Sequence, residues 1–594
     1  MLTDGFWKDR QKLNADVSIP NVYKRFKETN RIDCLYPKWK RPFSRSDRFY
    51  DSDTAKWLEA AAYVLHTNRA DYPELEKLCD KVIALFKKRQ QMNGYLNSFF
   101  QRRPFLPKFC FRTDHELYCA GHIMEAAVAY YQATGKDVLL KVSEKYADHI
   151  RKRFMIKKNT AFSTPGHEEI ELALYRMYEV TGKEKYKEMA EFFLNTRGTV
   201  KERTYRMFND AYDQHEIPVR ELSSAEGHAV RAMYLYCGMA DMARVNGDEE
   251  MLSACKRLFE DACKKMYVTG GIGSDHNGEC FTIPYDLPNE TAYAESCAAI
   301  SFMMFCRRML LIEKDGRYAD VIERIMYNNF LSCVSLDGKA FFYENPLEIC
   351  RADLTRSRTV KRRPRLPQWQ RQEVFSCSCC PPNINRTVAS VGDYIFTENE
   401  TETVLHQYVA CESGAISVET NYPVSGKIVV RGKSYGKEFF SVRIPARCKN
   451  ASLSLNGNPV DVAPEKRYVT LKVDSDFTLE LTLDTEPFFV KTHPLCRENR
   501  NKVALQRGPV VYCLEEKDNG DLAPLAAVCS GPFTEIKNDL TPLPFIDVQG
   551  KELTADATYY EGEYAAKDRT LRFIPYYAFG NRGESDMKVW VPLA

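Results

Sequence analysis

The chain is 594 residues long, which suggests about four domain-sized units, although large barrels and all-β domains can each absorb about 200–250 residues. Hydrophobic residues make up 44 % and charged residues 28 % of the chain, so a large core can form and wholesale disorder is excluded. The 84 Lys and Arg residues against 81 Asp and Glu leave a net charge of +3, too little to hold a phosphate backbone, so we expect no nucleic-acid partner.

The beginning of the chain shows no targeting or membrane signal. The residues from Met1 to Arg10 lack the apolar segment of a signal peptide. No apolar run anywhere approaches the ~18–20 residues that cross a bilayer, so we expect no membrane partner. We therefore expect a cytoplasmic protein, unless a leader peptide has been removed from the sequence.

The chain up to about residue 397 has the periodicity of helices. Three times a glycine and a histidine open an apolar run that closes at a second glycine before a charged turn: Gly121-His122 to Gly135, Gly166-His167 to Gly182, and Gly227-His228 to Gly247. A glycine can take the positive φ that ends a helix, and the amphipathic run after it forms an antiparallel partner helix. Hairpins of this kind stack in a solenoid or close into a ring, and the periodicity alone does not choose.

After about residue 400 the period changes from 3.6 to 2. Four apolar residues alternate with polar ones, as on a half-buried strand: Phe477, Leu479, Leu481 and Leu483. Asn456-Gly457 lies between two such runs, which indicates a hairpin. About 200 residues of short strands favour two antiparallel sandwiches. We therefore predict a helical domain over residues 1–397 and β-sandwich domains over 398–500 and 501–594.

One cluster stands out among the 20 cysteines of the chain. The total is about 3 % of the residues, well under the ~8–10 % that is typical of a disulfide scaffold, and most cysteines lie singly in apolar helical runs. Residues 377–382, in contrast, read Cys-Ser-Cys-Cys-Pro-Pro. One carboxylate and three sulfurs suit tetrahedral zinc, and the chain offers such a set: Glu295, Cys297, Cys379 and Cys380. The alternative is two buried cysteines beside a helix start.

The spacing of these residues restricts how they can meet. Residues i and i+2 lie on opposite sides of a helix, so Glu295 and Cys297 can chelate together only from a turn or a helix end. Pro381 disfavours the helical region for Cys380, so we expect the adjacent thiols to lie in non-helical backbone. A further carboxylate, Glu279, lies in a glycine-rich loop. Such loops often carry catalytic groups, although a lone loop glutamate is otherwise simply solvated.

Four segments together form a specific combination. They read Tyr-Val-Thr-Gly-Gly-Ile-Gly-Ser at 267–274, Ala-Glu-Ser-Cys at 294–297, Phe-Tyr-Glu-Asn-Pro-Leu at 342–347 and Cys-Ser-Cys-Cys-Pro-Pro-Asn at 377–383. This combination resembles glycoside hydrolase family 127, whose founding activity is β-L-arabinofuranosidase, and the resemblance covers most of the chain. It implies an (α/α)6 barrel followed by antiparallel β-sandwich domains, in which the helical hairpins would close into a ring.

The resemblance also implies roles for individual residues. Zinc is expected to bind Glu295, Cys297, Cys379 and Cys380, with Cys379 as the nucleophile and Glu279 as the general acid/base. Further residues match positions that are expected to touch the sugar: His115, His167, His228, Glu323 and Tyr343. A histidine at a helix start is otherwise more often a packed or capping residue.

These roles agree with elementary chemistry. A retaining glycosidase needs a nucleophile and an acid/base group on opposite sides of the anomeric carbon. A free thiol has a pKa near ~8.5 and is mostly protonated at neutral pH, and a bound zinc ion removes its proton. Glu279 would protonate the leaving oxygen and then activate water, so we expect burial to raise its pKa.

We therefore predict a zinc-dependent retaining exo-glycosidase that releases terminal β-L-arabinofuranose from plant-derived oligosaccharides. A neighbouring alternative keeps the same machinery and changes the sugar, for instance to the aceric acid of pectin side chains. A different class is a non-catalytic, zinc-stapled scaffold that binds carbohydrate, against which the additional carboxylate of Glu279 argues. The expected partner is a small oligosaccharide or glycoside, and the resemblance allows a homodimer.

Overall fold

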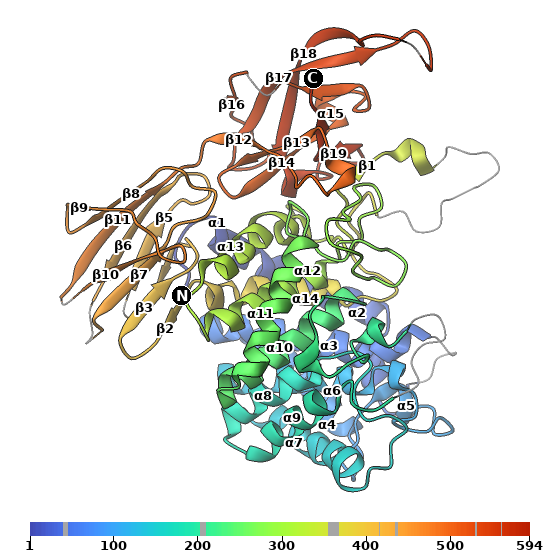
Figure 1. Ribbon diagram of the computed structural model, residues 1–594. Helices are drawn as coiled ribbons and strands as arrows, with labels where there is room; N and C mark the ends of the chain where they lie inside the picture. Colours follow the sequence, from blue (N-terminus) through green and yellow to red (C-terminus); the bar gives the residue numbers. More distant parts are fainter. Residues whose placement is uncertain are drawn as a thin grey trace.

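The computed structural model describes the whole chain except residues 40–44, 202–208, 355–367, 415, 434–436, 474, 529–530 and 560. Helices dominate the first part of the chain and strands the part after it (Figure 1). Among the described residues, contacts between six helices close a ring in the order α3, α6, α8, α10, α12, α14 and back to α3. These inner helices are α3 (Tyr50–Asn68), α6 (Glu116–Thr134), α8 (Ile170–Thr181), α10 (Ala229–Asn246), α12 (Ser296–Leu310) and α14 (Cys380–Ala389).

A second layer of helices packs against the outside of the ring and gives the (α/α)6 arrangement that the resemblance implied. An inner helix such as α10 is buried along most of its length, whereas its outer partner α11 buries one face only. The outer helices are α2 (Ile19–Glu28), α4 (Pro73–Arg89), α7 (Val138–Arg151), α9 (Glu184–Thr196), α11 (Glu249–Lys264) and α13 (Gly316–Ile325). Shorter helices are α1 (Phe6–Leu13), α5 (Ser98–Gln101) and α15 (Glu516–Asn519).

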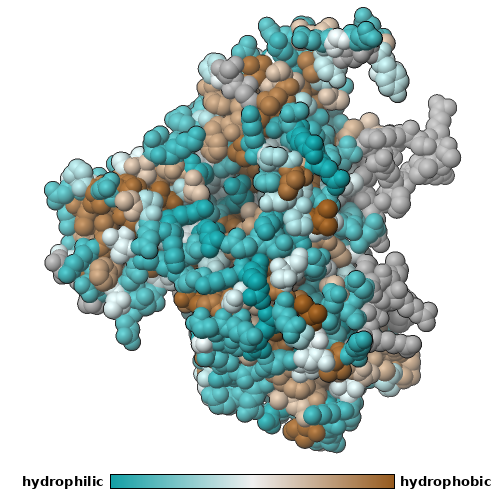
Figure 2. All heavy atoms as spheres, in the orientation of Figure 1, coloured by the Kyte–Doolittle hydropathy of each residue, from teal (hydrophilic) through white to brown (hydrophobic). Residues whose placement is uncertain are grey.

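The surface agrees with a helical body that faces water. On the face shown in Figure 2, hydrophilic side chains predominate and hydrophobic ones form scattered patches. None of the described helices combines the length and the apolar character that crossing a membrane requires.

The glycines that close the helical repeats end three inner helices, as predicted. Each follows its helix in the left-handed region, with φ of 75°, 65° and 63° at Gly135, Gly182 and Gly247. The opening pairs are less regular: α10 begins directly after His228, but α6 begins at Glu116, so Gly121-His122 lies inside that helix. Here the glycine permits a close approach of two helices, because a Cβ on Gly121 would lie 2.6 Å from Glu169 Cγ.

The described residues after α14 form three sheets, built almost entirely from antiparallel pairs. A four-stranded sheet has the order β10-β7-β3-β2, and a six-stranded sheet has the order β4-β5-β6-β11-β8-β9. Their strands are β2 (Phe396–Glu398), β3 (Glu402–Leu405), β4 (Cys411–Glu412), β5 (Ile416–Thr420), β6 (Lys427–Gly432), β7 (Phe439–Arg443), β8 (Ala451–Leu455), β9 (Asn458–Val460), β10 (Tyr468–Lys472) and β11 (Phe477–Leu483). The two sheets share a core, since the rings of Phe440 on β7 and Phe477 on β11 lie 5.1 Å apart.

The strand pattern read from the sequence is confirmed in this unit. The apolar residues of β11 are buried, and their polar neighbours are more exposed. Asn456-Gly457 forms the turn between β8 and β9, where Leu455 pairs with Asn458. One pair departs from the antiparallel expectation: β3 and β7 run parallel.

The third sheet ties the end of the chain to the helical part. It contains β12 (Pro487–Val490), β13 (Lys502–Arg507), β14 (Val510–Glu515), β15 (Leu525–Ala527), β16 (Thr534–Ile536), β17 (Phe545–Thr554), β18 (Ala565–Pro575), β19 (Met587–Lys588), β20 (Val591–Pro592) and an early strand, β1 (Glu348–Ile349). β1 pairs with β19, and the Val589 backbone N–H donates to the Leu347 carbonyl at 3.0 Å. The Tyr576 hydroxyl donates to the Pro346 carbonyl at 2.9 Å. The loop that precedes β1 is therefore held by the C-terminal sheet.

Candidate active site

One mouth of the helical ring collects most of the residues that the sequence singled out. Each inner helix pairs with an antiparallel outer helix. All inner helices therefore run in the same direction, and their N-terminal ends lie at the same mouth of the ring. Glu295 directly precedes α12, Cys379 precedes α14, His115 precedes α6 and His228 precedes α10. The positive ends of the helix dipoles favour anionic side chains here.

The backbone at two of these helix starts positions the sulfurs and the carboxylate. Glu295 has an extended conformation (φ −57°, ψ 137°) before Cys297 enters the first turn, which confirms the prediction of a helix end. The prediction for the adjacent thiols is wrong: Cys379 has helical dihedrals (φ −71°, ψ −32°), and Cys380 is the first residue of α14. Pro381 is tolerated because a residue in the first helical turn needs no hydrogen bond from its nitrogen.

Glu295, Cys297, Cys379 and Cys380 form one compact set, with one ligand atom of each residue within 4.8 Å of all the others. Cys297 Sγ lies 3.2 Å from Cys380 Sγ. Cys379 Sγ lies 3.8 Å from Cys380 Sγ and 3.9 Å from Cys297 Sγ. Glu295 Oε1 lies 3.4 Å from Cys380 Sγ and 3.8 Å from Cys379 Sγ.

This set fits a zinc ion in both spacing and donor type. Sulfurs bound to zinc at ~2.3 Å in a tetrahedron lie about 3.8 Å apart, close to two of the three observed separations, and the third, 3.2 Å, is shorter. Three thiols and one carboxylate are donors that zinc accepts in proteins. Glu295 Oε2 is buried and has no hydrogen-bond partner among the described residues, as expected of a carboxylate that binds a metal ion.

Cys379 is the sulfur of this set that ionises most readily. Hydrogen bonds from the thiols of Cys297, Cys377 and Cys380 hold the pKa of Cys379 well below its usual range. Burial raises the pKa of Cys297 and of Cys380 instead. The Tyr343 hydroxyl lies 3.3 Å from Cys379 Sγ, where it can donate to a thiolate. The geometry thus favours negative charge on one particular sulfur.

Glu279 lies beside this set, in the loop before α12. Its carboxylate forms a second group with Glu295 and His228, again with ligand atoms within 4.8 Å of one another. His228 Nδ1 accepts a hydrogen bond from the Arg231 backbone N–H at 3.4 Å, so the ring proton lies on Nε2. Nε2 then donates to Glu279 Oε2 at 2.8 Å. The Glu279 side chain is 38 % exposed, so a substrate can reach it.

The pKa of Glu279 lies below its usual value, and the prediction of a raised pKa is therefore wrong for this structure. Burial raises the pKa of the carboxyl, but the hydrogen bond from His228 stabilises the carboxylate and outweighs it. Burial lowers the pKa of His228. The sequence could not show this balance, because His228 and Glu279 come from different loops.

His115 and His167 continue the wall that begins at His228. The rings of His115 and His167 lie 5.6 Å apart, and those of His167 and His228 lie 5.5 Å apart. Burial lowers the pKa of both His115 and His167, so they are neutral. Their Nδ1 atoms lie 2.7 and 2.8 Å from the carbonyls of Thr113 and Glu168, which leaves each Nε2 as an acceptor for a hydroxyl. Their contact with a sugar stays a prediction.

Comparison with known proteins agrees with this geometry. The family model described as "Beta-L-arabinofuranosidase, GH127 catalytic domain" matches residues 1–393, and that of the "Glycoside hydrolase family 127 C-terminal domain" matches residues 487–592. The chain belongs to glycoside hydrolase family 127. It is 36 % identical to the non-reducing end β-L-arabinofuranosidase of Bifidobacterium longum subsp. longum, over 91 % of this chain and 89 % of that protein.

Solved structures of the family share the whole architecture. The GH127 β-L-arabinofuranosidase from Geobacillus stearothermophilus T6 has a TM-score of 0.93 and 39 % identity, with all of both chains covered. A second GH127 β-arabinofuranosidase has a TM-score of 0.88 and 31 % identity, over 100 % of this chain and 96 % of that one. The family 127 resemblance noted in the sequence is thus confirmed along the full chain.

Glu323 is the predicted site residue whose contacts among the described residues lie outside the group described above. Its carboxylate accepts hydrogen bonds from the Tyr422 hydroxyl and from Arg443 Nη2, each at 2.7 Å, and pairs with Arg447 at 3.4 Å. These partners belong to the first β unit, so Glu323 joins α13 to that unit. The geometry assigns it a structural contact, and its contact with the sugar stays a prediction.

Lys56 is a charged group that the sequence analysis missed. It is fully buried in the middle of α3, and its Nζ donates to the Tyr118 hydroxyl at 2.6 Å. Burial opposes the charge, but the neighbouring sulfurs of Cys297 and Cys379 outweigh it and raise the pKa of Lys56 above its usual value. The only signal in the sequence was a lysine inside the apolar helical stretch Ala-Lys-Trp-Leu at 55–58.

Proposed function

We propose that this family 127 protein is a retaining exo-glycosidase that releases terminal β-L-arabinofuranose from small, plant-derived oligosaccharides. One observation carries the proposal: the Glu279 carboxylate lies beside a compact set of three sulfurs and a carboxylate. A double displacement requires a nucleophile, here a thiolate, and a carboxyl acid/base on the two sides of the anomeric carbon. The β-L-arabinofuranosidases from Bifidobacterium and Geobacillus support the choice of sugar.

The residues that would hold zinc are Glu295, Cys297, Cys379 and Cys380. When bound there, zinc keeps thiols deprotonated at neutral pH, so that no dedicated base is needed to form the thiolate. Cys379 is the suitable nucleophile, because it belongs to the set beside the reachable Glu279 carboxylate and its Sγ lies 3.3 Å from the Tyr343 hydroxyl, which can donate to a thiolate. The Tyr343 hydroxyl orients the thiolate.

In the first step, the Cys379 sulfur attacks the anomeric carbon. The carbon–sulfur bond forms as the glycosidic carbon–oxygen bond breaks, and Glu279 gives its proton to the departing oxygen. Substrate covers the exposed side of Glu279, and this further burial raises its pKa toward the protonated form that the step needs. The result is a glycosyl–cysteine intermediate and a free alcohol.

In the second step, the Glu279 carboxylate takes a proton from water. The water oxygen bonds to the anomeric carbon, the carbon–sulfur bond breaks, and Cys379 leaves as a thiolate. Two inversions give net retention of configuration. His228 holds the carboxylate of Glu279 in place through both steps, and His115 and His167 accept from hydroxyls of the sugar.

The proposed machinery lies within one part of the chain. We assign it to a helical domain over residues 1–397, and the β units over 398–500 and 501–594 carry none of these groups. The family resemblance also allows a homodimer.

The test combines metal analysis with kinetics. We expect one zinc per chain, and hydrolysis of an aryl β-L-arabinofuranoside with the β-anomer as first product by NMR. Cys379→Ser should keep the fold and lose at least about a thousandfold in kcat. Cys306→Ser, at another buried cysteine outside the set, is the matched control and should keep its activity.

Other outcomes identify the alternatives. Preference for an aceric acid glycoside over the arabinofuranoside would keep the machinery and change the sugar. Zinc-loaded protein that binds arabinofuranosyl oligosaccharides but cleaves no activated glycoside would make it a binding scaffold. Full activity of Cys379→Ser would end the assignment of the nucleophile.

A further inference from the structure

The helical ring has a cavity at the end opposite the cysteines. Its volume is about 930 Å³, and residues from the C-terminal halves of all six inner helices line it. The start of the chain and strands β2 and β4 complete the wall. Pockets for small molecules in proteins commonly measure ~300–1,000 Å³, so this cavity is large enough for an oligosaccharide.

The cavity is separate from the proposed active site. Cys379 precedes α14, whereas Ser390, which lines the cavity, follows its last residue. Eleven residues of helix at 1.5 Å each put these positions roughly 16 Å apart along the axis of the ring. A ligand in the cavity therefore cannot contact the cysteine set.

A buried network of charges forms the floor of the cavity. Arg176 Nη1 lies 3.1 Å from Glu59 Oε1 and 2.9 Å from Glu125 Oε2, and Arg386 Nη1 lies 2.7 Å from Glu59 Oε2. Two arginines and two glutamates leave no net charge. Glu125 is 1 % exposed, and its Oε1 has no hydrogen-bond partner among the described residues. The floor is therefore a closely packed, charge-balanced network.

The walls are charged as well, and most of their charges are paired. Arg308 Nε donates to Asp241 Oδ2 at 2.8 Å, and Arg244 pairs with Glu179. Of the five arginines that line the cavity, four face a carboxylate, and Arg307 Nε donates to the Asp393 backbone carbonyl at 2.7 Å. A charged ligand would therefore meet little unpaired opposite charge. A neutral ligand avoids this conflict.

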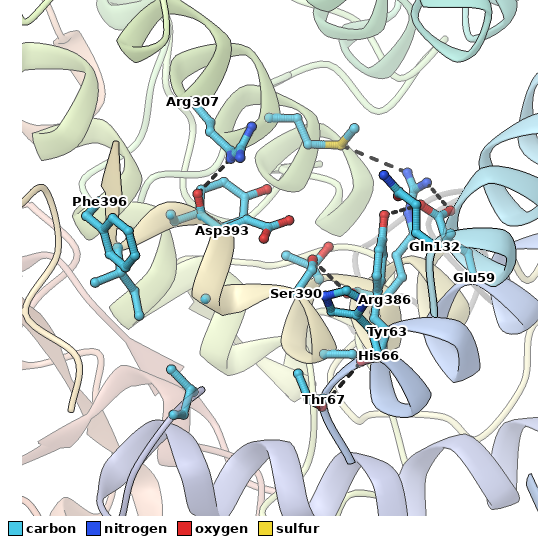
Figure 3. A pocket seen from close by; sticks show the side chains of 18 of the residues that line it. Glu59, Tyr63, His66, Thr67, Gln132, Arg307, Arg386, Ser390, Asp393 and Phe396 are labelled. Atoms are coloured by element: carbon cyan, nitrogen blue, oxygen red, sulfur yellow. Dashed lines mark hydrogen bonds and ion pairs between the residues drawn. The ribbon is translucent and has the colours of Figure 1, made fainter. Parts of the chain in front are cut away.

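The rim adds groups that suit hydroxyls and sugar faces. Figure 3 shows Gln132 and His66 on one side of the cavity and Arg307 and Phe396 on the other. An amide both donates and accepts hydrogen bonds, as a hydroxyl does. Aromatic rings such as that of Phe396 offer an apolar face to a sugar ring.

We propose that this cavity is a second carbohydrate site, which binds a neutral oligosaccharide apart from the proposed active site. Polyhydroxyl groups can donate to the carboxylates and accept from the guanidiniums without displacing any ion pair. Binding here does not require cleavage, so the site retains a carbohydrate chain independently of turnover.

The test measures binding of xylotriose and cellotriose by calorimetry, with trigalacturonate and inorganic phosphate as charged probes. Gln132→Trp narrows the cavity from the exposed end of α6, and His66→Trp does so from α3. Lys77→Trp, on the exposed side of the outer helix α4, is the matched control. Hydrolysis of an aryl β-L-arabinofuranoside should be the same in all variants.

We expect at least one neutral trisaccharide to bind the unmodified protein and the Lys77→Trp control equally. Gln132→Trp and His66→Trp should each weaken this binding at least about tenfold, or about 1.4 kcal/mol. The proposal is overturned if neither neutral trisaccharide binds, if both rim variants bind as the control does, or if only trigalacturonate or phosphate binds.

Discussion

Replacing Glu323 by alanine tests whether this residue supports the fold or touches the sugar. Glu323 is 4 % exposed and is the shared partner of Tyr422, Arg443 and Arg447. Removing one member of a buried ion pair leaves the other charge uncompensated and costs about 3–5 kcal/mol. Arg443 keeps a second carboxylate, Asp320, so we expect the lower end, about 3 kcal/mol. At ~2 °C per kcal/mol for larger domains, the unfolding midpoint should fall by roughly 6 °C.

The assay is scanning calorimetry together with kcat/KM for an aryl β-L-arabinofuranoside at 25 °C. The variant should be less stable yet keep kcat/KM within about threefold, because Glu323 does not contact the catalytic residues. Glu323→Gln, which keeps a hydrogen-bond acceptor, should lose less stability. The matched control is Glu419→Ala, which removes an exposed carboxylate paired with Arg431 and should leave the midpoint nearly unchanged.

One pattern of results would refute this reasoning. An unchanged unfolding midpoint with KM raised more than about tenfold would mean that Glu323 binds the sugar. The structural role would then have to be withdrawn, and the predicted contact with the sugar restored.

Acid should remove part of the stabilisation that Glu323 gives to the fold. The pKa of Glu323 is depressed, because the charge of Arg443 outweighs burial. Its contribution to the free energy of unfolding is therefore present above the unfolded pKa of ~4.3 and is lost as the pH falls through the folded pKa. The gap in midpoint between the unmodified protein and Glu323→Ala should therefore narrow in acid. His228→Ala removes a hydrogen-bond donor from Glu279 and leaves burial to raise the pKa of that carboxyl. Because Glu279 must be protonated in the first step, the alkaline limb of the kcat/KM profile should move to higher pH, and an unmoved limb would contradict Glu279 as the acid/base. Tyr343→Phe should lower kcat about tenfold to a hundredfold, because a hydrogen bond to a charged group contributes about 1.5–3 kcal/mol, and unchanged kinetics would exclude the contact with Cys379. A chelator should abolish activity and lower the unfolding midpoint, with recovery on adding zinc; full activity of metal-free protein would contradict the proposed site.

Local features of the fold could be read from the sequence. Gly135 ends a helix and Asn456-Gly457 turns a hairpin because the φ preferences of a few adjacent residues decide both. Gly121 was misread for the same reason. A glycine in a helical run can mark an end or a close crossing, and only the neighbouring helix distinguishes the two.

The candidate site was harder to predict from the sequence, because its residues are far apart along the chain. Cys379 and Glu295 are 84 positions apart. Donor type suggested a zinc set but left two buried cysteines as the alternative, and the family resemblance chose between them. The contacts of Glu323 could not be read from the sequence either, because its partner Arg443 lies 120 positions away in a different unit. Lys56 left almost no signal, because a single lysine in an apolar run forms no motif from which its position beside the sulfurs could be predicted.

The attachment of the loop before β1 has a consequence for how the protein matures. This loop carries Tyr343, and residues as late as Val589 hold its far end. Ribosomes deliver the helical ring first, with every cysteine of the proposed zinc site already present. The far end of this loop is secured only after β19 emerges and docks. A nascent or shortened chain lacking that strand should therefore fold much of its barrel, yet hold the loop beside the nucleophile less firmly and turn over more slowly.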